Sequence, residues 1–176
     1  MEALRISPMI SEDEIQERVR KIGESLTDKF RGQELVAVGI LKGSFMFYAD
    51  LIRAIDTDLT CDFCGVSSYS DSMTSSGEVK LTLDLSRSIR DKNVLIIEDI
   101  VDTGLTMNFL KRHLSSHKPK SITTISLLLK PDALKEKCEV DYVGFKIPND
   151  FVVGYGLDYQ GYYRNLSYIA QVSNIN

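Results

Sequence analysis

The sequence lacks any apolar segment long enough to cross a membrane. No stretch approaches the ~20 consecutive apolar residues of a transmembrane helix, and the first residues contain no apolar core of signal-peptide length. With 176 residues, of which 43% are hydrophobic and 26% charged, the composition is that of one ordinary globular domain. We therefore expect a single cytoplasmic domain over residues 1–176 with no membrane partner.

Cysteine and clustered basic residues are also scarce. Three cysteines cannot all pair, and Cys61 and Cys64 are spaced to lie on opposite faces of a strand. Cys138 has no histidine near it in sequence, so we expect three buried or half-buried thiols in a reducing compartment rather than a zinc site. The net charge is −4 and the basic residues form no long run, which argues against a nucleic-acid partner.

The only two histidines, His113 and His117, lie four residues apart in a segment that reads as a helix. This spacing can bind a metal ion, but no third ligand is evident in the sequence. Lys and Arg residues surround the pair near the predicted helix C-terminus, where positive charge complements the helix dipole. The sequence therefore favours an electrostatic role over metal binding.

Periodic apolar residues predict an amphipathic helix that begins at Ser11. Ser11 followed by Glu14 fits a capping box. The apolar side chains then recur every three or four residues, as one face of a helix requires, at Ile15, Val19, Ile22, Leu26 and Phe30.

Apolar strands alternate with helical segments in the middle of the chain. LVAVGIL is a continuous apolar strand, VLIIEDIV and ITTISLLL are further strands, and FMFYADLIRAI and LTMNFLKRHL read as helices between them. LTCDFCGVSSY and GEVKLTL predict a strand pair around a polar loop. We expect an α/β fold with a mainly parallel twisted sheet flanked by helices, its core at about 33–145 and a small cap from about 1–30 and 146–176.

The segment VLIIEDIVDTGLTM contains the first group of candidate functional residues. Glu98 and Asp99 follow four apolar residues, so the strand is expected to reach the surface there. The following residues, 102–106, open a helix at the carboxyl end of a parallel strand, where free amides and the helix dipole favour a phosphate. The chain has no G-x-x-x-x-G-K-[ST], and Tyr159 replaces the last glycine of a G-x-G-x-x-G, which disfavours P-loop and dinucleotide-binding proteins.

This segment closely resembles the phosphoribosyl-pyrophosphate signature of type I phosphoribosyltransferases. Four further segments, LKGSFMF, SSYSDSMTSSGEVK, LLLKP and FVVGYGLDYQGYYR, resemble the hypoxanthine-guanine phosphoribosyltransferase family in particular. The resemblance implies a Mg²⁺-dependent purine salvage enzyme that joins hypoxanthine or guanine, with xanthine left open, to phosphoribosyl pyrophosphate. It also implies a homodimer or homotetramer. The alternative is a non-catalytic regulator of the same fold that binds phosphoribosyl pyrophosphate or RNA.

The resemblance assigns the ribose 5-phosphate side of the site. Glu98 and Asp99 would contact the ribose hydroxyls and bind Mg²⁺, whose preferred ligands are carboxylates and water. Asp102 would be the general base for the purine ring. The 5-phosphate would bind a loop in which Leu105 replaces a residue that is often polar or basic in relatives: Asp102, Thr103, Gly104, Leu105 and Thr106.

The resemblance also assigns the base and pyrophosphate sides. Lys130 would donate to the 6-oxo group, although a lysine that ends a strand can also simply extend into solvent. The other expected purine contacts are Phe151, Val152 and Asp158, the last also a ligand of a second Mg²⁺. Pyrophosphate would contact Lys42, Gly43 and Arg164, with a non-proline cis peptide at Lys42–Gly43, and a mobile loop would begin at Ser68 and Tyr69.

Overall fold

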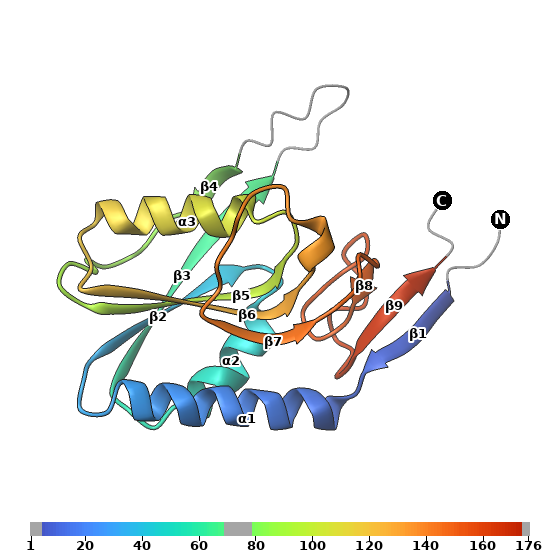
Figure 1. The fold of residues 1–176 in the computed structure, drawn as a ribbon, viewed down its shortest axis with the longest axis horizontal. Coiled ribbons are helices and arrows are strands. Elements are labelled where there is room, and N and C mark those ends of the chain that lie inside the picture. The colour runs from blue at the N-terminus through green and yellow to red at the C-terminus, as the bar shows by residue number, and fades with distance from the viewer. Residues whose placement is uncertain (1–4, 69–78, 174–176) are drawn as a thin grey trace.

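A six-stranded sheet forms the centre of the computed structural model, which describes residues 5–68 and 79–173 (Figure 1). Its strands are β2 (Leu35–Leu41), β3 (Leu59–Ser68), β4 (Val79–Leu83), β5 (Asn93–Val101), β6 (Ser121–Leu129) and β7 (Tyr142–Lys146). They are ordered β4-β3-β2-β5-β6-β7, and every neighbouring pair is parallel except β3 and β4. The predicted mainly parallel α/β sheet is confirmed.

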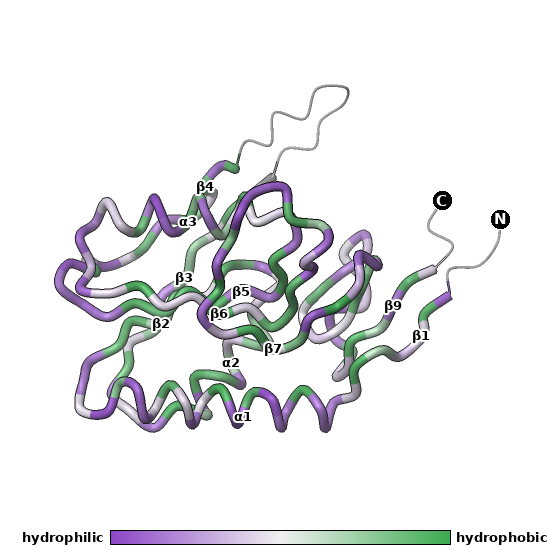
Figure 2. The backbone as a smooth tube through the Cα atoms, viewed as in Figure 1, coloured by the Kyte–Doolittle hydropathy of each residue, from purple (hydrophilic) through white to green (hydrophobic). Residues whose placement is uncertain are grey.

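Helices cover both faces of this sheet. Helices α1 (Glu12–Lys29) and α2 (Phe45–Arg53) lie on one face and α3 (Leu105–Ser116) on the other (Figure 1). Successive residues of the apolar strands point to opposite faces, so Leu35 packs in the cluster under α1 and α2, whereas Val36 packs in the cluster under α3. The tube is accordingly green along the central strands in Figure 2. No helix in the two described ranges is long and apolar enough to cross a membrane.

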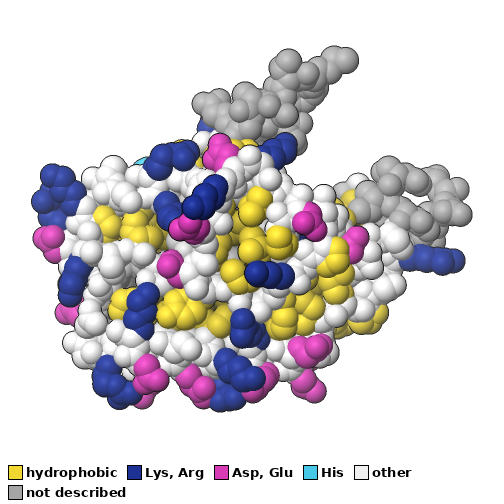
Figure 3. Space-filling model, viewed as in Figure 1, with side chains coloured by type: hydrophobic (Ala, Val, Ile, Leu, Met, Phe, Trp, Pro, Cys, Tyr) yellow, Lys and Arg dark blue, Asp and Glu magenta, His cyan; other side chains and the backbone are white. Residues whose placement is uncertain are grey.

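The start of α1 confirms the predicted capping box. The Ser11 hydroxyl accepts from the Glu14 amide at 3.3 Å, and the Glu14 carboxylate accepts from the Ser11 amide at 2.9 Å. The outer face of α1 carries ion pairs of Arg20 with Glu17 and Glu24. Basic and acidic side chains consequently alternate along this edge of the molecule in Figure 3.

A small antiparallel sheet joins the two ends of the described chain. It comprises β1 (Arg5–Ile10), β9 (Ile169–Ser173) and β8 (Val152–Val153), in that order. The expected cap also included α1. The apolar stripe of α1 is buried in one cluster with residues of both the central sheet and the C-terminal segment, whereas β1 pairs directly with β9.

The three cysteines lie in different environments. Cys64 is buried under α3, and Cys138 is half-buried. Cys61 points to the opposite face of β3, as the spacing predicts, but it belongs to neither large apolar cluster and is exposed. The expectation of three buried or half-buried thiols is therefore wrong for Cys61.

Candidate active site

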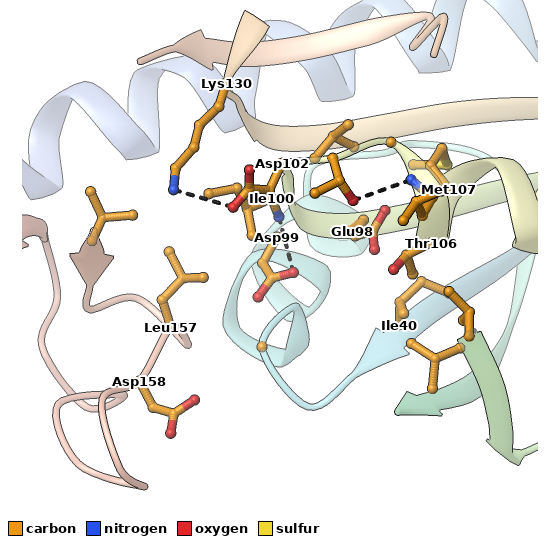
Figure 4. Close-up of a pocket in the computed structure, with 18 of the residues that line it drawn as sticks. Ile40, Glu98, Asp99, Ile100, Asp102, Thr106, Met107, Lys130, Leu157 and Asp158 are labelled. Atoms are coloured by element: carbon orange, nitrogen blue, oxygen red, sulfur yellow. Dashed lines mark hydrogen bonds and ion pairs between the residues drawn. The ribbon is translucent and has the colours of Figure 1, made fainter. Parts of the chain in front are cut away.

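A cavity of about 680 Å³ lies at the carboxyl ends of β2, β5 and β6. The parallel register aligns these three ends along one edge of the sheet. Figure 4 shows carboxylates from the end of β5 projecting into this region, with Lys130 approaching from the end of β6. Most of the predicted site residues line the cavity: Gly43, Glu98, Asp99, Asp102, Thr103, Gly104, Leu105, Thr106, Lys130, Phe151, Val152, Asp158 and Arg164.

Glu98 is buried, which corrects the expectation that the strand reaches the surface at this residue. Its exposed fraction is 5%, because β5 runs on to Val101 between β2 and β6 and the side chain points into the cavity wall. Burial, reinforced by the charge of Asp99, raises the pKa of Glu98 well above its usual range. Among the described residues, its Oε2 atom is a buried side-chain oxygen without a hydrogen-bond partner. Such an atom indicates a ligand that this carboxylate would meet in the cavity.

Asp99 packs directly over Gly43. A Cβ atom at position 43 would lie 1.6 Å from Asp99 Oδ2, so only glycine allows the loop after β2 to approach the end of β5 this closely. Burial raises the pKa of Asp99 to about 6, against the opposing influence of its hydrogen bond from the Ile100 amide and of the Arg164 charge. The carboxyl therefore titrates close to neutral pH in the free protein.

The loop after β2 contains a cis peptide bond between Leu41 and Lys42. The cis peptide bond was expected at Lys42–Gly43, one residue further toward the C-terminus. The glycine is needed for its small size beside Asp99 and not for the cis bond. Gly43 lines the cavity, whereas the exposed Lys42 is not among the lining residues.

The residues that open α3 form a loop with neutral hydrogen-bond donors. Gly104 is the N-cap residue at φ 83°, a conformation that favours glycine, and the amide of Leu105, the first helical residue, donates to the Thr103 hydroxyl at 3.4 Å. A Cβ atom on Gly104 would also lie 2.8 Å from Cys138 Cβ, so the segment after β6 packs tightly behind the loop. The other first-turn amides and the positive end of the helix dipole make this end of the cavity suited to an anion.

Lys130 is buried and pairs with Asp102. Its exposed fraction is 6%, and its Nζ atom lies 3.4 Å from Asp102 Oδ2 (Figure 4). The alternative of a lysine that extends into solvent is therefore wrong. Lys135 also lines the cavity, after the short 3-10 helix Pro131–Ala133, and its amide donates to the Thr103 carbonyl at 3.0 Å. Sequence reasoning missed Lys135, because nothing in KPDALKEK distinguishes it from the neighbouring lysines.

The C-terminal segment closes the cavity from the side of the cap. Phe151 is 43% exposed, and the edge of its ring meets Tyr159 at 5.8 Å between centroids. Val152 is buried in β8. Arg164 pairs with Asp158 at 2.6 Å and donates to the Gly156 carbonyl at 2.6 Å, which fixes both charged groups at the cavity edge.

Two expected features lie partly outside the described residues. Tyr69 belongs to the range 69–78, which the structure does not describe, and Ser68 is the last residue of β3, paired with Val79.

Three side chains outside the cavity, two of them the histidines at metal-binding spacing, lie together in the structure. One candidate ligand atom from each of Asp84, His113 and His117 lies within 4.8 Å of the other two. The third candidate ligand, which was not evident in the sequence, is Asp84, because the fold brings it beside His113 from 29 residues earlier in the chain.

Comparison with known proteins identifies the class to which this fold and cavity belong. Residues 11–160 match the family model described as a phosphoribosyl transferase domain. A hypoxanthine-guanine phosphoribosyltransferase of Bacillus subtilis is 50% identical over 162 residues, which cover 92% of this chain and 90% of that protein. The chain belongs to the phosphoribosyltransferases, and within them to the hypoxanthine-guanine phosphoribosyltransferase family.

Two further relatives show how far the similarity extends. A crystal structure of a hypoxanthine phosphoribosyltransferase from Staphylococcus aureus has a TM-score of 0.90 at 49% identity, covering 94% of this chain and 90% of that chain. The bifunctional protein TilS/HprT of Listeria innocua is 50% identical over 92% of this chain, but the chain spans only 25% of that longer protein.

Proposed function

We propose that the protein transfers the 5-phosphoribosyl group of phosphoribosyl pyrophosphate to hypoxanthine or guanine. The bond from ribose C1 to the pyrophosphate oxygen breaks, a bond from C1 to a purine ring nitrogen forms, and IMP or GMP and pyrophosphate result. The observation that carries this proposal is the buried Lys130 ammonium 3.4 Å from the Asp102 carboxylate, beside the N-terminus of α3. Relatives named for this activity at about 50% identity support it.

The purine base would displace the Lys130–Asp102 ion pair. Lys130 would donate to the 6-oxo group, which favours 6-oxopurines because a 6-amino group would present a second donor and leave both donors unsatisfied. Asp102, released from the lysine, would take the proton that the purine ring loses as it attacks C1. The exposed ring of Phe151 would stack on the base, and the Val152 backbone would meet its edge.

The phosphate groups would bind at opposite sides of the cavity. The 5-phosphate would receive hydrogen bonds from the loop of residues 102–106 at the start of α3. Pyrophosphate would contact Arg164 and the loop of Lys42 and Gly43. The guanidinium already faces this side of the cavity, where Asp158 holds it.

The carboxylates suit Mg²⁺. Glu98 and Asp99 offer oxygen donors, and the unpartnered Glu98 Oε2 fits a cation that would relieve the cost of its burial. Asp158 would hold a second ion on the pyrophosphate side. Bound Mg²⁺ would supply positive charge that neutralises the diphosphate leaving group and orders the substrate oxygens.

Other expectations remain part of the proposal. A cytoplasmic homodimer or homotetramer without a nucleic-acid partner is what the family resemblance and the composition suggest. On the face drawn in Figure 3, basic side chains are interspersed with acidic ones and no continuous basic surface is visible. This distribution gives no support to the RNA-binding alternative.

A spectrophotometric assay with phosphoribosyl pyrophosphate and Mg²⁺ would test the proposal, with hypoxanthine, guanine, xanthine and adenine offered separately. We expect turnover of 6-oxopurines and a loss of about 10² to 10⁴ in kcat for Asp102→Asn. Asp132→Asn is the matched control, because Asp132 is exposed beside the same loop but does not line the cavity. No turnover with any base, in a protein that still binds phosphoribosyl pyrophosphate, would overturn the enzyme proposal in favour of the regulator.

A further inference from the structure

The far end of α3 gathers the only two imidazoles of the chain beside a carboxylate. His113 lies in the last turn of α3, and His117 is the C-cap residue. Asp84 follows the last residue of β4, on the edge strand of the sheet. Its Oδ1 atom lies 3.0 Å from His113 Nε2, and the rings of His113 and His117 meet edge to face at 5.1 Å between centroids.

The spacing is close to that of a metal centre. Two ligand atoms on a tetrahedral Zn²⁺ ion, each about 2.0 to 2.1 Å from it, lie about 3.3 Å apart. The Asp84–His113 pair, at 3.0 Å, already has this separation, and both other pairs lie within 4.8 Å. The remaining contraction, at most about 1.5 Å, falls on His117, whose side chain is exposed and can rotate.

Two of the ligands are held in place by contacts outside the cluster. Asp84 Oδ1 also accepts from the Leu85 amide at 2.8 Å, and the Phe109 ring lies parallel to that of His113 with 6.1 Å between centroids. Such contacts orient ligands around a metal and add to its affinity.

We propose that Asp84, His113 and His117 form a binding site for a borderline-soft divalent ion such as Zn²⁺. Two imidazoles and one carboxylate are ligands that suit Zn²⁺, whereas Mg²⁺ prefers oxygen ligands alone. With three protein ligands, the remaining position would be filled by water. The ion would tie the end of β4 to α3, two elements that otherwise meet here through the Asp84–His113 bond.

Untagged protein titrated with Zn²⁺ in excess Mg²⁺, without substrate, would test this site. We expect one ion per chain by calorimetry, a rise in Tm, and displacement of both histidine imidazole signals in a ¹H–¹⁵N spectrum. Because the chain has only two histidines, this spectrum reports on the proposed ligands alone. The experiment needs no catalysis, so its result is independent of the proposed transferase activity.

Four variants provide the comparison. His117→Gln and Asp84→Asn each remove one ligand on an exposed side chain and are expected to weaken Zn²⁺ binding at least about tenfold and to abolish the rise in Tm. Ser115→Ala changes an exposed residue of the same turn that is not in the cluster and is expected to bind as the original protein does. Unmoved imidazole signals, unchanged binding in both ligand variants, or binding abolished by Cys61→Ser would overturn the proposal.

Discussion

The two ends of helix α3 present opposite chemistry to a ligand. At the N-terminus, the first turn of the helix and small, neutral loop residues border the cavity. At the C-terminus, two imidazoles meet the Asp84 carboxylate at the surface. A helix carries about half a positive charge at its start and half a negative charge at its end, so an anion is favoured at one end of α3 and a cation at the other.

The two ends also differ in how strongly the folded protein disfavours the charged form of their carboxyl groups. Glu98 is buried and Asp99 is half-buried at the cavity, and burial raises the pKa of both. Asp84 has a side chain that is 48% exposed, and a hydrogen bond from His113 lowers its pKa. Ionising the carboxyls at the cavity therefore destabilises the folded protein through lost hydration, an effect that a bound cation can offset. Ionising Asp84 at the other end destabilises it little.

The largest expected effect is at the start of α3. Gly104→Ala places a side chain at φ 83°, 2.8 Å from Cys138 Cβ, and displaces the loop that we propose holds the 5-phosphate. We expect the KM for phosphoribosyl pyrophosphate to rise about 100-fold, because displacements near 1 Å have effects of this size. Steady-state kinetics at saturating hypoxanthine would measure it.

Gly32→Ala is the matched control for this change. Gly32 has a similar φ of 70°, but a Cβ atom there would meet nothing within 4 Å. It should lower stability by about 1 to 2 kcal/mol and leave the KM unchanged. An equal rise in KM for both variants would mean that backbone strain, and not the loop, causes the effect.

The next largest effect is expected for the stability of Asp99→Asn, measured after EDTA has removed any bound metal. The folded pKa of Asp99, about 6, lies above the usual value, so its contribution to stability is fully present at low pH and is lost as pH rises through 6. Asp99→Asn should then be more stable than the original protein at pH 7.5 by about 1 to 3 kcal/mol. The difference should vanish below about pH 3, where the carboxyl is protonated in both states. Urea unfolding at several pH values would measure it, and an offset that does not change with pH would contradict the assigned cause.

The smallest effect is expected at the opposite end of the helix. Asp84→Asn without metal should lower stability by less than about 1 kcal/mol, since the pair with His113 is largely exposed. The pKa of Asp84 is lowered, so its contribution is present above the usual value and is lost as pH falls through the folded value. The same urea series, extended to acidic pH, would measure it. A pH dependence with the same sign as that of Asp99 would refute the contrast between the two ends.

Elements whose signal is local could be predicted from the sequence. The capping box of Ser11 and Glu14, the strand Leu35–Leu41 and the loop that opens α3 each depend on residues within one or two turns of one another. The carboxyl ends of parallel strands meet at one edge, so the order of strand and loop also placed Asp102 and Lys130 in one cavity. The burial of Glu98 was not predictable, because it depends on the neighbours β2 and β6.

By itself, the sequence determined the fold class, the family and most of the cavity lining. Apolar periodicity and the EDIVDTGLT segment are patterns among residues that are close together in the sequence, so they can be recognised without the structure. Only the tertiary structure decided that Lys130 pairs with Asp102, that Gly43 makes room for Asp99, and that Asp84 joins the two histidines. The cluster of Asp84 with the two histidines depends on the end of an edge strand packing against the end of a helix. These two elements lie about 30 residues apart in the sequence, and no local sequence pattern predicts a contact over that separation.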